Sequence, residues 1–241
     1  MIDIDSLNRT ALLIGSNKAQ NISNTKVIIF GVGGVGSWCA EALVRSGISH
    51  LTIVDPDKVV QSNINRQLQA TTKTLGQFKA DVITERLREI NPDAVISTIK
   101  EFYSADNFEK FNIGEYDYII DAIDSIQSKI DLIIRAHNLG VTIYSSMGAA
   151  CRMDPTRIKI GNIWDTVGCK LSRAVRSELR KKNMTQKHIC VWSDETLPNL
   201  IKQPVIKGQK RVNGSIMHIT AIFGIDLAYL VINDIINSKL I

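Results

Sequence analysis

Short apolar runs recur along the first 150 residues of the chain. They lie at 27–30, 51–54, 94–99, 117–121 and 141–145, and each run is bounded by turn-forming or polar residues. Runs of this length and composition are typical of β-strands. The first part of the chain is therefore predicted to supply the strands of a sheet.

Helical patterns separate these predicted strands. Ala40, Leu43 and Val44 share one helical face, apolar residues over 76–90 recur at spacings of three and four, and 125–139 is also helical by pattern. Strands that alternate with helices form βαβ units with right-handed crossovers. The pattern predicts an α/β protein with a Rossmann-like, doubly wound and mainly parallel sheet.

The pattern changes after residue 150. We predict a strand over 157–163, a basic helix over 166–182, a strand over 189–193 and a helix over 215–238, with 183–214 otherwise irregular. No linker-like stretch precedes this part. We therefore interpret it as a C-terminal elaboration of the same domain.

A single domain over 1–241 is expected, with a nucleotide-binding core over 9–150 and the elaboration over 151–241. The last predicted helix is long and apolar, but Asp226 and Asp234 interrupt it. We interpret it as a buried or interfacial helix and expect no membrane span.

Composition narrows the class of protein. Hydrophobic residues make up 44% and charged residues 22% of the 241 residues, which excludes collagen-like, low-complexity and disordered chains. Cys39, Cys151, Cys169 and Cys190 lack the paired spacing of zinc ligands. Because no signal peptide is recognisable, we expect reduced cysteines and a cytoplasmic location.

The positive charge is concentrated in one segment. The formal net charge is +5, yet residues 151–190 hold ten Lys and Arg against three Asp and Glu. The rest of the chain is nearly neutral. Such a segment is either a solvated helix face or a surface for an anionic partner.

A glycine-rich turn lies between the first predicted strand and the first predicted helix. Its glycines are Gly31, Gly33, Gly34 and Gly36, and Asp55 closes the next strand 24 residues after Gly31. Glycines there let the backbone approach a phosphate, and the acid can bind ribose hydroxyls. This fingerprint alone also fits an NAD-dependent dehydrogenase, or close helix–strand packing without any nucleotide.

Further polar clusters follow the predicted strands. The run 63–67 contains Arg66, Lys79 comes thirteen residues later, and Asp121 and Asp124 follow the strand at 117–121. Separately, these residues could be surface charges or helix caps. Together, two cations and two carboxylates at strand ends favour a triphosphate with Mg²⁺ over a dinucleotide.

In combination, these motifs resemble those of the E1-like (ThiF-type) activating enzymes. The family pattern is an N-terminal Arg, G-x-G-G-x-G, an acid, N-x-x-R-Q, a Lys and D-x-x-D. The matching residues here are Arg9, Gly31–Gly36, Asp55, Asn63, Arg66, Gln67, Lys79, Asp121 and Asp124. The resemblance implies that the chain binds ATP and Mg²⁺ and adenylates a carboxylate, and that Arg9 reaches the ATP of the other subunit in a homodimer.

Within this family, the chain resembles the branch of the tRNA threonylcarbamoyladenosine dehydratases. Ser125 and Lys129 stand where the carrier-activating branch has Asn and Arg, and Asn65 is a second Asn typical of the dehydratase branch. The implied substrate is N6-threonylcarbamoyladenosine at position 37 of tRNA, which carries a free carboxylate. Adenylation followed by attack of its own ureido group would give a cyclic product without a covalent enzyme intermediate.

The resemblance also implies residue roles. Asp124 would ligate Mg²⁺ with Asp121 in support, and Arg9, Arg66 and Lys79 would act catalytically by stabilising charge on the phosphates. The expected nucleotide-binding residues are Gly31, Gly33, Gly34, Gly36, Asp55, Asp57, Asn63, Asn65, Arg66, Gln67, Lys79, Asp121, Asp124 and Ser125.

The expected partners are tRNA, a second copy of the chain and proteins of a sulfur-transfer system. The expected tRNA contacts are Lys170, Arg173, Arg176, Arg180, Lys181 and Lys182. Two alternatives stay open. The chain could adenylate the C-terminus of a ubiquitin-like or sulfur-carrier protein and use Cys151, Cys169 or Cys190. It could also be a nucleotide-binding RNA-interaction module without catalysis.

Overall fold

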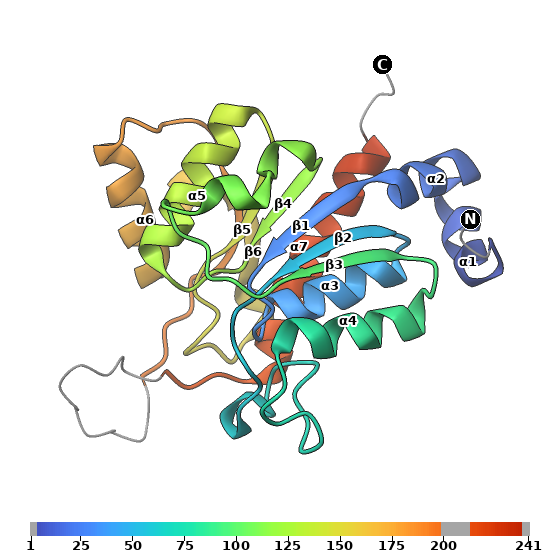
Figure 1. Ribbon diagram of the computed structural model, residues 1–241. Helices are drawn as coiled ribbons and strands as arrows, with labels where there is room; N and C mark the ends of the chain where they lie inside the picture. Colours follow the sequence, from blue (N-terminus) through green and yellow to red (C-terminus); the bar gives the residue numbers. More distant parts are fainter. Residues whose placement is uncertain (1–3, 199–212, 238–241) are drawn as a thin grey trace.

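One seven-stranded sheet with helices on both faces forms the protein, in a computed structural model that describes residues 4–198 and 213–237 (Figure 1). The strand order is β3-β2-β1-β4-β5-β7-β6, and only β6 runs antiparallel to its neighbour. This is the doubly wound, mainly parallel sheet that the sequence predicts. The strands are β1 (Lys26–Phe30), β2 (His50–Val54), β3 (Val95–Ile99), β4 (Tyr118–Asp121), β5 (Thr142–Ser146), β6 (Ile158–Asn162) and β7 (Ile189–Ser193).

The helices also follow the predicted order from residue 36 onward. Each predicted helix is found within a few residues of its expected bounds, whereas two N-terminal helices were not predicted. The helices are α1 (Ile4–Ile14), α2 (Ser16–Asn24), α3 (Gly36–Arg45), α4 (Lys79–Ile90), α5 (Ile126–Leu139), α6 (Lys170–Lys181) and α7 (Met217–Asn237). Residues 199–212, which belong to the stretch predicted to be irregular, lie outside the described residues.

Side chains of β1 alternate between two hydrophobic cores. Val27 and Ile29 pack in the core under α3, α4 and α7, whereas Ile28 and Phe30 pack in the core under α5 and α6. Successive residues of a strand point to opposite faces, so a central strand covered on both faces is apolar throughout. The C-terminal elaboration completes this arrangement, because β6 and β7 extend the sheet and α7 covers the first core.

Helix α7 lies against α3 in the first core. Phe223, Leu227 and Val231 are fully buried, and Gly224 approaches the α3 backbone closely. Within the described residues, α7 is the one helix long and apolar enough to cross a membrane, and half of that stretch is buried in the protein. Its packing agrees with the expectation of a core helix.

The two ends of the sheet differ in what they carry. Helices α1 and α2 precede β1 and lie at the amino ends of the strands (Figure 1). At the carboxyl ends, glycine-rich and polar loops lead into α3, α4 and α5. Parallel strands of this fold bind ligands in the crevice outside their carboxyl ends.

Candidate functional site

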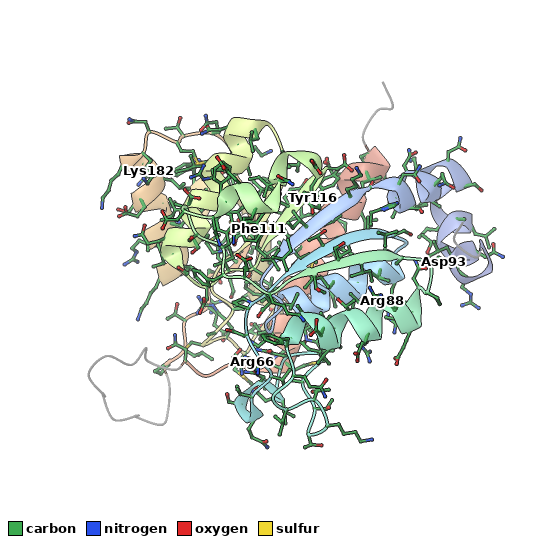
Figure 2. All side chains as sticks on the ribbon, viewed as in Figure 1. Arg66, Arg88, Asp93, Phe111, Tyr116 and Lys182 are labelled. Atoms are coloured by element: carbon green, nitrogen blue, oxygen red, sulfur yellow. The ribbon has the colours of Figure 1, made fainter. Side chains whose placement is uncertain are left out.

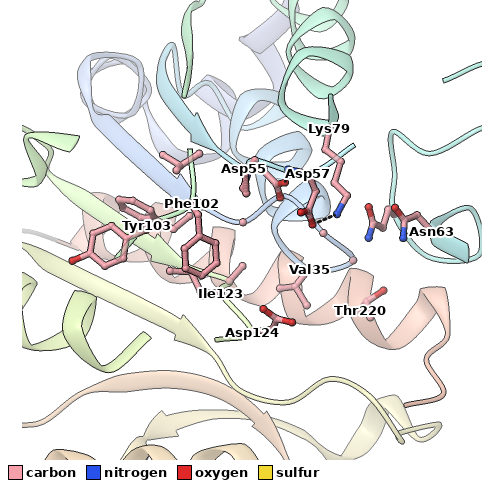
Figure 3. A pocket seen from close by; sticks show the side chains of 18 of the residues that line it. Val35, Asp55, Asp57, Asn63, Lys79, Phe102, Tyr103, Ile123, Asp124 and Thr220 are labelled. Atoms are coloured by element: carbon pink, nitrogen blue, oxygen red, sulfur yellow. Dashed lines mark hydrogen bonds and ion pairs between the residues drawn. The ribbon is translucent and has the colours of Figure 1, made fainter. Parts of the chain in front are cut away.

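A pocket of about 600 Å³ opens at the carboxyl ends of the strands (Figure 3). The loops that follow β1, β2, β3 and β4 line it, together with Thr220 in the first turn of α7. Most of the residues predicted to bind a nucleotide line this pocket. They are Gly31, Gly33, Gly34, Asp55, Asp57, Asn63, Arg66, Gln67, Lys79 and Asp124.

The glycine loop forms the floor where β1 passes into α3. Gly31 has a φ of +88° and its N–H donates to the Val54 carbonyl over 2.8 Å. A side chain at Gly36 would meet the Gly31 carbonyl oxygen at 1.9 Å, so only glycine fits there. Gly36 itself does not line the pocket and acts by allowing the turn. Backbone N–H groups and a helix N-terminus at this point favour a bound phosphate.

Asp55 is buried beneath this loop. Its carboxylate accepts the Val32 N–H at 2.8 Å and the Asp57 N–H at 2.9 Å. Burial raises the pKa of Asp55, and nearby Lys79 acts in the opposite direction. Each carboxylate oxygen can accept more than one hydrogen bond, so Asp55 can also receive ribose hydroxyls.

Two cations lie at one end of the pocket. Lys79 begins α4, is buried, and places its Nζ 2.8 Å from Asp57 Oδ2. Arg66 is half-buried and donates through Nη1 to the Ser62 carbonyl and to Asn65 Oδ1, each at 2.8 Å. Burial lowers the pKa of Arg66, and an anionic ligand beside it would oppose that shift.

Two buried amides support the same end. Asn63 Oδ1 accepts the Val60 N–H at 3.2 Å, which closes the short turn before Arg66. Gln67 Nε2 lies 3.7 Å from the point where a Gly33 Cβ would be, and its buried Oε1 has no partner among the described residues. A buried amide group without a partner is expected where a ligand completes the hydrogen bonding.

The other end of the pocket is aromatic. Phe30 and Tyr103 meet edge to face at 5.0 Å between ring centroids, and Phe102 and Ile123 line the same end (Figure 3). Phe102 is about half exposed. Sequence analysis missed Phe102 and Tyr103, although their place just after β3 puts them at the carboxyl end of a strand that neighbours β2.

Asp121 does not line the pocket, which corrects the prediction that its side chain contacts the nucleotide, whereas its role in support of Asp124 stays a prediction. Its side chain is fully buried and pairs with Lys129 Nζ at 2.6 Å. Asp124 is exposed and lines the pocket, as predicted. The two aspartates of one motif thus point to different sides of the strand end.

Three further predicted residues have other positions. Asn65 lies beside the pocket lining and donates through Nδ2 to the Ser215 carbonyl at 2.8 Å. The carbonyl of Ser125 accepts the Lys129 N–H at the start of α5. Arg9 is exposed on α1, at the opposite end of the sheet from the pocket (Figure 1).

The predicted tRNA-contacting cations lie on and just after α6, away from Arg66 (Figure 2). Lys170, Arg173 and Lys182 are exposed. Arg180 lies 5.3 Å from the Trp164 ring centroid, and Lys181 pairs with Glu178 at 2.6 Å.

Arg176 is the exception within this helix. It is half-buried and donates to Thr166 and to the Ile163 carbonyl. This guanidinium ties α6 to the turn before it. The contact of Arg176 with tRNA stays a prediction.

Known proteins share this sequence and this fold. The ThiF family model matches residues 7–235. A tRNA threonylcarbamoyladenosine dehydratase of Bacillus subtilis is 39% identical over 204 residues, which cover 85% of this chain and 80% of that protein.

Solved structures agree with these sequence matches. The Escherichia coli tRNA N6-threonylcarbamoyladenosine dehydratase in complex with ATP has a TM-score of 0.87 at 31% identity, and covers 96% of this chain and 94% of that one. The same enzyme in complex with AMP has a TM-score of 0.86 with the same identity and coverage.

Proposed function

The chain belongs to the ThiF family, and from that membership we propose that it is an ATP-dependent tRNA threonylcarbamoyladenosine dehydratase. It converts N6-threonylcarbamoyladenosine at position 37 of tRNA into its cyclic form by adenylating the threonyl carboxylate. The observation that carries the proposal is the order of side chains along the pocket, because that order matches the parts of ATP.

Phe102 and Tyr103 lie on one side of Asp55, and Lys79 lies on the other (Figure 3). The half-exposed ring of Phe102 offers a surface for adenine, and Asp55 offers acceptors for the ribose. The glycine loop, Arg66 and Lys79 then meet the triphosphate. The α-phosphorus would lie between the loop and these cations.

The carboxylates of the pocket suit Mg²⁺, which prefers oxygen ligands and often takes one or two carboxylates beside substrate phosphates. Asp124 would hold the ion. The described residues contain no cluster of three or more ligating side chains, so phosphate and water oxygens would complete its coordination. When bound, Mg²⁺ neutralises phosphate charge.

The reaction needs side chains that stabilise negative charge on the phosphates and that align the reacting groups. An oxygen of the threonyl carboxylate attacks the α-phosphorus, the bond to the β-phosphate oxygen breaks, and pyrophosphate leaves. Arg66 and Lys79 stabilise the negative charge that develops there. The ureido group then attacks the acyl carbon, AMP leaves with one carboxylate oxygen, and the ureido proton is released. Net loss is one water.

A homodimer would complete the site. Arg9 lies at the far end of the sheet from the pocket of its own chain. We propose that Arg9 of one protomer reaches the triphosphate bound by its partner, which adds a third cation at the phosphates.

The basic face of α6 is proposed to bind tRNA phosphates. Lys170 and Arg173 lie on its first turn, next to Cys169, whose Sγ approaches Gly148 at the carboxyl end of β5. Lys182 lies past the other end of α6, about 18 Å from Lys170 along a helix that rises 1.5 Å per residue.

Docking of sulfur-transfer proteins and a cytoplasmic location stay predictions from the sequence.

Carrier-protein adenylation fits the cysteines less well. Cys169 and Cys190 are buried, and burial raises the pKa of Cys190 to about 12. A buried thiol with a raised pKa is a poor nucleophile. Cys151 is half-buried and has a φ of +57°. Its thiol is not by itself evidence for adenylation of a carrier protein.

The proposal is tested with ATP, Mg²⁺ and tRNA that carries threonylcarbamoyladenosine, followed by mild digestion and mass spectrometry. The nucleoside should lose about 18 mass units, one water. Asp124→Ala should abolish the loss, and Asp106→Ala, an exposed aspartate outside the pocket, should not. An unchanged nucleoside with folded, ATP-binding protein would contradict the proposal.

A further inference from the structure

Behind the pocket, the buried Asp121 carboxylate collects hydrogen bonds from three elements. Lys129 Nζ donates to Oδ2 at 2.6 Å from α5, and Ser145 Oγ donates to Oδ2 at 2.7 Å from β5. The Ile123 N–H donates to Oδ1 at 3.1 Å from the loop that follows β4. Both Lys129 and Asp121 are 0% exposed. The proposed ATP chemistry uses none of these donors.

The chain of hydrogen bonds continues through two histidines. His188 Nε2 lies 2.9 Å from Ser145 Oγ, and its Nδ1 lies 3.4 Å from His137 Nε2. His188 is buried, whereas His137 is half-buried. This hydrogen-bond relay therefore runs from His137 on α5, through His188 just before β7 and Ser145 on β5, to Asp121 at the end of β4.

Proton counting fixes the direction of this relay. An ionised carboxylate can only accept hydrogen bonds, so the single hydroxyl proton of Ser145 is donated to Asp121. Ser145 Oγ must then accept from His188, which places the His188 proton on Nε2 and leaves Nδ1 to accept from His137. Every donor in the relay points toward Asp121.

The hydrogen bonds to Asp121 fix the position of the loop that follows β4. Asp121 Oδ1 holds the amide of Ile123, the residue directly before Asp124. The same loop fits tightly against the glycine loop, because a Cβ on Gly31 would meet the Ala122 carbonyl oxygen at 2.9 Å. A small rotation at Asp121 would thus move Ile123 and Asp124 relative to the phosphate site.

We propose that Lys129, Ser145 and His188 are positioning residues, which hold Asp121 so that the 122–124 loop presents Asp124 to the nucleotide. The role rests on the proposed ATP chemistry. This role explains why the Lys129–Asp121 ion pair is fully buried. A buried ion pair that only stabilises the fold contributes little more free energy than apolar packing would. Displacements of about 1 Å at a reacting centre can lower turnover by about a hundredfold.

The first test compares two neighbouring serines of β5. Ser145→Ala removes one donor to Asp121, whereas Ser146→Ala removes a buried hydroxyl that donates to the Met147 carbonyl instead. We expect Ser145→Ala to lower kcat about tenfold, with less effect on the KM for ATP, because one hydrogen bond to a buried charge is removed. Ser146→Ala should keep kcat within about twofold.

The second test asks whether the donated proton matters at His188. Glutamine can place an N–H near the Nε2 position, and leucine cannot. His188→Gln should retain most of the turnover, and His188→Leu should resemble Ser145→Ala. Lys129→Met, which leaves Asp121 buried without its cation, should lose more, and the Asp121→Asn/Lys129→Met double variant should fold and still turn over slowly.

A third readout needs no activity. Amide hydrogen exchange of the protein without nucleotide should show faster exchange at Ile123 in Ser145→Ala and His188→Leu, and unchanged exchange in Ser146→Ala. If the wild-type protein makes no cyclic nucleoside, the proposed function fails while exchange at Ile123 still tests the positioning role. Equal exchange at Ile123 in all serine and histidine variants, or equal kcat in the two serine variants, would overturn the proposal.

Discussion

The ammonium nitrogen of Lys79 lies 2.8 Å from Asp57 Oδ2 at the phosphate end of the pocket, and the lysine side chain is 8% exposed while the aspartate is 66% exposed. A buried cation with an exposed counterion can exchange that counterion for a phosphate group without leaving its place. This pair therefore holds Lys79 Nζ in place at the pocket before ATP binds.

Lys79→Met should lower kcat/KM for ATP by about a hundredfold or more, because it removes a cation at the phosphates in a shielded site. Steady-state release of pyrophosphate measures the effect. Lys73→Met, an exposed lysine in the loop before α4, is the matched control and should be unchanged. Similar losses in both variants would show that the effect is not specific to the pocket.

Arg9 tests the proposed dimer. Arg9→Ala and Lys79→Met should each be nearly inactive alone, since each removes a cation from every site. Unfolded and refolded together, they should recover about a quarter of wild-type activity, because half of randomly paired dimers carry one intact site. No recovery from a mixture that forms mixed dimers would contradict a shared site.

The order of elements could be predicted from the sequence because apolar runs and glycine turns are local signals. The orientation of the Asp121 side chain could not be predicted from the sequence. The D-x-x-D spacing places both aspartates at a strand end but does not indicate which of them faces the pocket. The Asp121 partners Lys129 and Ser145 come from other elements, and only the strand order brings them together.

The N-terminal helices were missed for a different reason. Leu12 and Leu13 of α1 are 80% and 85% exposed, so the apolar pattern of this segment does not match a single buried face. Phe102 and Tyr103 join the pocket because β3 lies beside β2 in the sheet, which is also a non-local property.

Binding of tRNA should depend on salt in proportion to the number of phosphates that the protein neutralises. Lys170→Ala with Arg173→Ala should reduce the slope of log affinity against log salt by about one for each phosphate that is no longer neutralised. Lys18→Ala, an exposed lysine on α2 at the opposite end of the sheet, should leave the slope unchanged. An unaltered slope in the double variant would place the tRNA elsewhere.

His188 should make the fold sensitive to acid. Burial, followed by His137 and Lys129, lowers the pKa of His188 from 6.5 to about 3. The unfolded chain therefore binds a proton that the folded chain does not, so its stabilising contribution is complete above pH 6.5 and is lost as pH falls toward 3.

Chemical denaturation at about pH 7 and about pH 5 should show a loss of about 2 kcal/mol of unfolding free energy from this group. His188→Gln cannot titrate and should lack that part of the loss. An identical pH dependence in wild type and His188→Gln would mean that His188 takes up a proton in the folded state.

Transfer of oxygen tests the central claim, adenylation of the threonyl carboxylate, most directly. The tRNA substrate is prepared with oxygen-18 in that carboxylate and incubated with ATP and Mg²⁺, and the AMP is then weighed by mass spectrometry. Adenylation predicts one labelled oxygen in each AMP, formed together with the dehydrated nucleoside. Dehydrated nucleoside accompanied by unlabelled AMP would contradict the account.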